Sequence, residues 1–102
     1  MIARLWRGRA TAAKADSYAR HFTGTVAPQL KTLPGHKGAW LLCRDVDGRT
    51  EFLTVTLWQS REVIEAFAGK DISRAHVEPE GRAALESFDD FADHYEVAYA
   101  GS

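Results

Sequence analysis

The sequence predicts an α+β fold of the ferredoxin-like type, with a four-stranded antiparallel sheet and helices packed on one of its faces. Three observations lead to this prediction. Segments with strand and helix periodicity follow one another in the order strand, helix, strand, strand, helix, helix, strand. A hairpin with a tight turn occupies the middle of the chain. The 102 residues contain no internal repeat, low-complexity tract or linker, so we expect a single domain over residues 1–102.

The chain opens with a strand and a helix. In "MIARLWRGRA" the alternation places Ile2, Arg4 and Trp6 on one face of a strand. The next segment, "TAAKADSYARHFTGTVAPQLKTLPG", has helical spacing, with an apolar stripe formed by Tyr18, Phe22 and Val26. Pro28 and the glycine four positions before it interrupt this helix, so we expect a kink or a short second segment after Ala27.

The segment "KGAWLLCRDVDGRTEFLTVTLW" predicts a β-hairpin. Asp47-Gly48 suits the positive φ angles of a tight turn between two strands. In the first arm Ala39, Leu41 and Cys43 alternate with Trp40, Leu42 and Arg44. In the second arm Phe52, Thr54, Thr56 and Trp58 alternate with Leu53, Val55 and Leu57. Both faces are largely apolar, whereas a sheet with one wet face alternates more cleanly. Since helices cover only one face, we expect a second copy of the chain to cover the other, giving a homodimer packed sheet to sheet.

The second half of the chain predicts two short helices and a last strand. Ser60 is suited to cap the helix "REVIEAFAG", which Gly69 ends. The loop "KDISRAHVEPEG" has room for one helical turn that begins at Asp71. A second helix is expected over "RAALESFDDFA" (residues 82–92), with its leucine and Phe88 inward, and a strand over "DHYEVAYA" (residues 93–100).

Composition excludes several function classes. The formal net charge is −1, so no basic field would attract nucleic acid, and no apolar run approaches the roughly 20 residues that span a bilayer. Charged residues stand at the N-terminus where a signal peptide needs an apolar core, so we expect a cytoplasmic protein. The one cysteine, Cys43, excludes an internal disulfide and a multi-cysteine metal site, and we expect it to be a small buried residue of a strand. The chain has no dinucleotide fingerprint, phosphate-binding glycine loop or Ser-His-Asp set.

Four segments together resemble the antibiotic biosynthesis monooxygenase domain family, within the dimeric α+β barrel superfamily. They are "MIARLWRG", "LPGHKGAWLLCR", "EFLTVTLWQSREVIEAFAG" and "HYEV". The resemblance implies a cofactor-independent monooxygenase that oxidises a flat aromatic or polyketide-like molecule in an apolar pocket between sheet and helices. An electron-rich phenol, deprotonated in a dry pocket, could reduce oxygen directly while the protein supplies a base and stabilises the oxyanion.

The same resemblance suggests particular site residues. In the quinone-forming monooxygenases a tryptophan at a strand end acts with an asparagine four positions earlier; Trp58 matches the tryptophan, and Thr54 stands at the asparagine position. In the heme-degrading branch a histidine after the second helix ligates iron. His76 falls at that spacing, while Phe67 replaces the tryptophan of that branch. Heme binding with His76 as axial ligand is therefore the first alternative function. A non-catalytic dimeric module that binds a small ligand, or is purely structural, is the second.

Side-chain chemistry adds further candidates. Arg4 could orient an acidic or quinone oxygen, or pair with Glu96 on the last strand. His94 and Tyr95 lie on opposite faces of that strand, so only one of them can face a given cavity, the first as a general base and the second as a holder of a substrate phenol. His21 could face the same cavity. His36 is most simply a turn residue. Trp58 and His76 also have readings without a functional role, in which Trp58 packs at the junction of sheet and helix and His76 is solvated.

The predicted site therefore has two sets of residues and no metal, except for His76 if heme is bound. The candidate catalytic residues are Trp58, Thr54, His76 and His94. The candidate substrate-binding residues are Arg4, Trp6, Phe67 and Tyr95.

Overall fold

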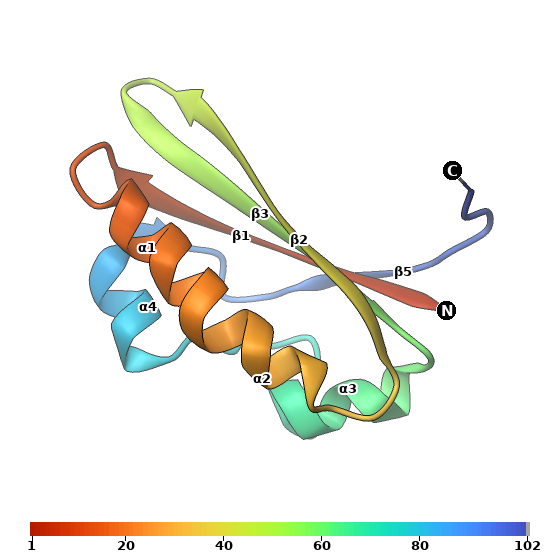
Figure 1. Cartoon of the computed structure of the whole chain (residues 1–102). Coiled ribbons are helices and arrows are strands. Elements are labelled where there is room, and N and C mark those ends of the chain that lie inside the picture. The colour runs from red at the N-terminus through yellow and green to blue at the C-terminus, as the bar shows by residue number, and fades with distance from the viewer. Residues whose placement is uncertain (102) are drawn as a thin grey trace.

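The computed structural model describes residues 1–101 and consists of one sheet covered on one face by helices (Figure 1). The strands are β1 (Ile2–Thr11), β2 (His36–Val46), β3 (Arg49–Trp58), β4 (Ser87–Phe88) and β5 (Asp93–Glu96). The helices are α1 (Ala15–His21), η1 (Phe22–Val26), α2 (Ala27–Lys31), α3 (Arg61–Ala68) and α4 (Pro79–Ala84). Within the described residues, no helix has both the length and the apolar character needed to cross a membrane.

The sheet is antiparallel, with the order β2-β3-β1 and with β4 and β5 both paired to the outer edge of β1. Gly8 pairs with Phe88 on β4, and Arg4 pairs with His94 on β5. Two short strands thus share the fourth position of the predicted four-stranded sheet. The ferredoxin-like α+β prediction is confirmed, but the last strand ends at Glu96 and not at residue 100.

The predicted helix over residues 82–92 is wrong. Helix α4 begins at Pro79, a residue that is favoured in a first turn, and Leu85 already has extended backbone angles. The chain then follows the edge of the sheet, where the N–H of Glu86 donates to the carbonyl of Arg9. Pairing with β1 satisfies these backbone groups and presses Phe88 against Trp6, with ring centroids 5.9 Å apart.

The first helical region contains the predicted irregularity. Pro28 has no N–H to donate in a regular α-helical ladder, and a π-helical segment, η1, precedes it. The N–H of Ala27 donates to the carbonyl of Phe22, five residues back. The wider turn lets α1, η1 and α2 continue as one rod across the sheet (Figure 1).

The hairpin turn forms as predicted. Asp47 and Gly48 have φ angles of 52° and 79°, so both central residues of the two-residue turn are left-handed. Figure 1 shows that the tip of this hairpin extends beyond the helices. The expectation of a buried Cys43 is therefore wrong: its strand face is the helix-covered one, but it lies toward the uncovered tip and is exposed.

Two hydrophobic clusters form the core between sheet and helices. The first contains Trp6, Ala10, Tyr18, Phe52, Ala84, Leu85 and Ala92, and the second contains Ile2, Phe22, Leu30, Trp58 and Ile64. The opposite face of the sheet has no helix over it. Trp40, Leu42 and Tyr95 on that face are 49%, 48% and 57% exposed, which leaves the predicted apolar face uncovered in a single chain.

We predict that Gly35→Ala destabilises the fold. Gly35 joins α2 to β2 with φ +84°, and an added Cβ would lie 2.8 Å from a methyl carbon of Val63 on α3. The backbone strain and the clash should lower the free energy of unfolding by about 1–3 kcal/mol, measured by chemical denaturation. The control is Gly24→Ala, where an added Cβ meets nothing within 4 Å; it should raise stability by about 0.5–1 kcal/mol. Equal effects of the two substitutions would contradict this account.

Candidate functional site

A hollow lies between the covered face of the sheet and the helices. Its empty space is about 570 Å³ including the open mouth, and its enclosed part holds only a few water molecules. Its floor comes from β1 and β3, through Arg4, Trp6, Thr54 and Thr56. Its walls come from the first helical rod, α3 and the segment leading into α4, through Tyr18, His21, Phe22, Val26, Leu30, Phe67, His76, Val77, Glu78 and Gly81. The walls are mostly aromatic and aliphatic, with a few polar groups among them.

Arg4 places a buried positive charge in the floor. It is only 4% exposed, and its Nη2 donates to the carbonyl of Arg74 over 2.8 Å. Its guanidinium carbon lies 5.8 Å from the centre of the Phe67 ring, while Nε has no hydrogen-bond partner. Burial lowers the pKa of Arg4 to about 10, which leaves the side chain protonated near neutral pH.

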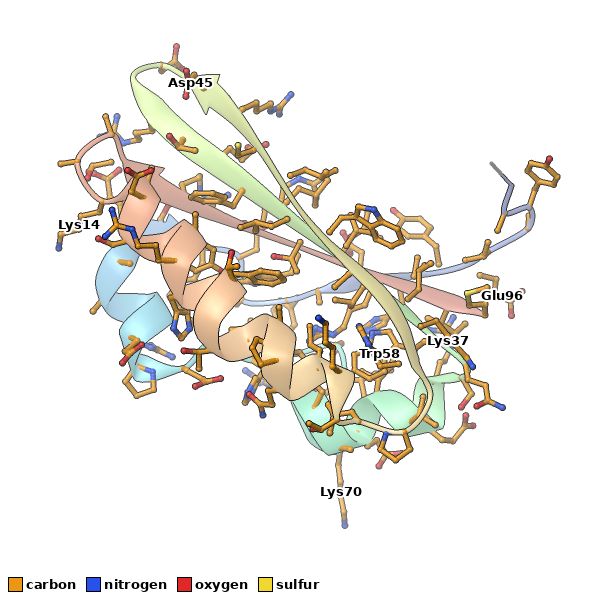
Figure 2. All side chains as sticks on the ribbon, in the orientation of Figure 1. Lys14, Lys37, Asp45, Trp58, Lys70 and Glu96 are labelled. Carbon is orange, nitrogen blue, oxygen red and sulfur yellow. The ribbon has the colours of Figure 1, made fainter. Side chains whose placement is uncertain are left out.

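The predicted pairing of Arg4 with Glu96 is wrong. On β5 the residue opposite Arg4 is His94, and Glu96 lies opposite Ile2, at the end of the sheet by the N-terminus (Figure 2). Within residues 1–101, Arg4 forms no ion pair with a carboxylate. A buried cation without an anionic partner is costly and needs an explanation beyond folding.

His94 lies beside Arg4 on the same face of the sheet, outside the lining of the hollow. Its Nε2 is buried without a hydrogen-bond partner. Burial lowers the pKa of His94, and the positive charges of Arg4 and Arg61 lower it further. Tyr95 points to the uncovered face, as the alternation on this strand requires, and is away from the hollow.

Trp58 is packed in the core and does not line the hollow. It is fully buried, and its indole N–H donates to Thr56 Oγ1 over 2.8 Å. Its ring lies against Phe67 at 5.9 Å and edge-on to His36 at 5.1 Å. Figure 2 shows Trp58 where the end of β3 meets α3 and the end of α2. His36 is the first residue of β2 rather than a turn residue, and burial lowers its pKa.

Thr54 and Trp6 both line the floor, but they offer different hydrogen-bonding groups. The indole N–H of Trp6 is occupied by the carbonyl of Asp89 at 2.7 Å. Thr54 Oγ1 is buried and forms no hydrogen bond of regular geometry, although its interaction with Tyr18 slightly offsets the effect of burial on that phenol. Burial still raises the pKa of Tyr18 to about 12, so the phenol is neutral.

The rim is formed by Phe67 and the residues that follow α3. The His76 ring stands edge-on to the Phe67 ring, with centroids 4.8 Å apart, and the residue is largely exposed. Glu78 also lines the hollow, and its Oε1 is buried without a hydrogen-bond partner. The described residues contain no cluster of three or more His, Cys, Asp or Glu side chains that could hold a metal ion.

His21, which we expected only as a residue that could face the cavity and gave no role, belongs to the lining. It is the last residue of α1, is buried, and lines the hollow with Nδ1 3.2 Å from Glu80 Oε2. Its position three residues after the inward Tyr18 was a usable signal, because residues three apart share a helix face. The structure thus brings five predicted residues together, namely Arg4, Trp6, Thr54, Phe67 and His76, and leaves Trp58, His94 and Tyr95 outside the lining.

This fold and hollow define an α+β domain with a partly open hollow between sheet and helices, and solved structures share the fold. A Bacillus cereus protein assigned to the antibiotic biosynthesis monooxygenases has a TM-score of 0.67 at 15% identity, over 99% of this chain and 96% of that one. The heme-degrader MhuD of Mycobacterium tuberculosis, solved with two hemes in its active site, has a TM-score of 0.63 at 20% identity over 100% of both chains. The monooxygenase ActVA-Orf6 of Streptomyces coelicolor, solved with Nanaomycin D, has 0.55 at 15% identity, over 99% and 88%.

The amino-acid sequence identifies the family to which the chain belongs. Residues 1–79 match the model of the antibiotic biosynthesis monooxygenase family, and the chain belongs to that family. No curated protein matches the sequence. Because the sequence identities to the solved structures are low, these structures show a shared fold only. The activity of this chain must be argued from its own residues.

Proposed function

We propose that this chain is a cytoplasmic, cofactor-independent monooxygenase that oxidises a flat aromatic molecule carrying an ionisable oxygen. The observation that carries the proposal is Arg4, a buried cation with no carboxylate partner on the floor of an aromatic-lined hollow. An anionic phenolate or enolate oxygen would supply the missing negative charge. Membership in the monooxygenase family supports the same reaction class.

The reaction needs only the substrate and oxygen. Removal of a proton from an acidic methylene or phenol leaves an electron-rich anion, which reduces O₂ and combines with it as a hydroperoxide. Loss of water then leaves a carbonyl, so that a CH₂ group and O₂ become C=O and H₂O. The protein contributes a base, a dry site and a positive charge at the developing oxyanion.

Arg4 is suited to hold that oxyanion. Its stem and guanidinium are fixed by the Arg74 carbonyl and the Phe67 ring, so little reorganisation is needed when charge develops. Thr54, whose hydroxyl has no regular partner, offers a second donor on the same floor. Entry of a bicyclic or larger ring requires the rim at His76 to move outward, because the enclosed space admits only a few water molecules.

Heme binding is a second candidate function, and the place of His76 on the rim is the observation in its favour. Heme would have to displace more of the structure than a smaller ring. His76 packs edge-on against Phe67 and the Arg4 guanidinium lies over the same ring, so a porphyrin beside the histidine requires both contacts to break. We therefore rank heme below the aromatic substrate.

The uncovered sheet face is proposed to be the interface of a homodimer. It carries the exposed Trp40 and Leu42 and the half-buried Leu53, Val55 and Leu57. A contiguous apolar surface of this kind is a usual sign of a protein contact. A second copy presents the same apolar strip and would cover it by twofold symmetry.

We predict that Arg4→Met lowers oxidation of a model substrate, 1,8-dihydroxyanthrone, about 10²-fold in kcat/KM, because the oxyanion loses its cation. Oxygen uptake and quinone absorbance would be measured together, with Arg20→Met, an exposed arginine of α1, as the matched control. Unchanged rates in Arg4→Met would refute the assigned role. Binding of the anthrone without oxidation would make the chain a non-catalytic ligand-binding module.

We predict that hemin gives no saturable Soret shift at one heme per chain. The titration would be run in parallel on the wild type and on His76→Ala, since a nonspecific shift should survive the substitution. A saturable shift that requires His76 would overturn this ranking and make heme the ligand.

We predict that the wild type sediments as a dimer and that Val55→Arg converts it to a folded monomer. The arginine would place a charge at the centre of the apolar interface, while in a single chain it would face water. Thr25→Arg, an exposed position on the helix layer, is the control and should stay dimeric. A monomeric wild type at tens of micromolar would contradict the proposed interface.

A further inference from the structure

We propose that His21, oriented by Glu80, is the base that removes the proton from the substrate in the hollow. The inference rests on the proposed function and assigns a residue to its first step. It departs from the sequence-based expectation that His76 or His94 is the base.

The position of His21 meets the geometric requirement. Its side chain is 6% exposed and lines the hollow from the end of α1, one turn after Tyr18, with ring centroids 6.2 Å apart. Arg4 lines the same hollow from the floor, on β1. A substrate anchored through its oxygen at Arg4 would therefore share the hollow with His21 in its wall.

Glu80 favours one nitrogen of the His21 ring as the acceptor of the substrate proton. Nδ1 lies 3.2 Å from the carboxylate Oε2 of Glu80, so Nδ1 carries the proton and donates it. Nε2 is then the nitrogen with a free lone pair, and within residues 1–101 it makes no hydrogen bond. The carboxylate of Glu80, itself 78% exposed, thus favours the tautomer that leaves Nε2 for proton abstraction.

Gly81 leaves room for the ring. A Cβ at this position would lie 3.1 Å from both Cδ2 and Nε2 of His21. Any other residue would press on the nitrogen that is left free. The packing of α4 against α1 thus brings the carboxylate of Glu80 to Nδ1 and only the backbone of Gly81 beside Nε2.

The other ionisable groups near the hollow are less suitable. His94 lies outside the lining, and its Nε2 is enclosed beside Arg4. His76 is exposed on the rim with its ring against Phe67. Tyr18 is neutral. Glu78 lines the wall with one buried oxygen, but among residues 1–101 no hydrogen bond orients that oxygen. Among the histidines, His21 alone of the described residues combines burial, a place in the lining and a carboxylate partner.

The step balances without an oxidant. A C–H or O–H proton of the substrate moves to Nε2, and its electron pair remains on the substrate as an enolate or phenolate, whose oxygen Arg4 holds. The ring becomes an imidazolium that stays paired with Glu80. Oxygen enters only afterwards, so proton removal can be measured alone.

The test is anaerobic deuterium exchange of the methylene protons of 1,8-dihydroxyanthrone, followed by NMR in D₂O. The wild type should accelerate the exchange over buffer, and His21→Gln should reduce the acceleration at least about 10²-fold. His21→Ala should lose it likewise and recover part of it with added imidazole, a rescue that a purely structural role would not show. Circular dichroism would establish that each variant is folded.

Two carboxylate variants test the role of Glu80 as a positioning residue. Glu80→Gln keeps an oxygen that accepts from Nδ1–H but removes the charge, so exchange should fall less than in His21→Gln. Glu62→Gln, at an exposed position of α3, is the matched control and should leave exchange unchanged. Exchange retained in His21→Gln, or lost in His76→Gln or His94→Gln instead, would overturn the assignment, as would a wild type that does not accelerate exchange.

Admitting oxygen separates this inference from the proposed function. If the wild type exchanges the protons but forms no quinone, His21 is a base and the monooxygenase proposal fails. If quinone forms at equal rates in wild type and His21→Gln, the monooxygenase proposal stands and the assignment of His21 fails.

Discussion

The burial of one face of β1 along its whole length is the constraint on which the rest of the structure depends. Every second residue of this strand, from Ile2 to Ala10, is buried beneath the helices. Arg4 lies within this apolar row, with only the Arg74 carbonyl and the Phe67 ring in place of water. An apolar side chain would suit folding as well or better, because an unpaired buried charge costs free energy. A local conflict of this kind is expected where a site has requirements of its own.

Local patterns in the sequence were sufficient for much of the fold. The alternation in β1 and in the hairpin, and the Asp47-Gly48 turn, depend on residues adjacent in the chain, and they formed as predicted. The end of the chain could not be predicted in this way. The apolar spacing after Leu85 fits a helix as well as an edge strand, and the choice depends on carbonyls of Arg7 and Arg9 about eighty positions earlier.

The candidate site was likewise predictable where it depends on residues close in the chain, and not where it depends on distant ones. Alternation correctly placed Arg4 and Trp6 on one face of the first strand, but it could not tell that Phe67 and His36 would enclose the ring of Trp58. The pair of His21 and Glu80 joins residues 59 positions apart, and Glu80 belongs to an acidic stretch that composition alone assigns to solvent. Family membership fixes the fold that brings such residues together, whereas what the hollow can do depends on the polar groups that line it.

The break between β4 and β5 has a consequence for how a ligand reaches the hollow. The residues in that break pair with the segment after α3: the N–H of Ala75 donates to the carbonyl of Asp90, and the N–H of Ala92 donates to that of Ser73. This segment leads directly into the rim at His76, and Arg4 is bonded to its Arg74 carbonyl as well. Hydrogen bonds thus join this segment both to the chain between β4 and β5 and to the guanidinium of Arg4. Outward movement of this backbone breaks these hydrogen bonds, so we expect entry of a large ligand to depend on how often the segment opens.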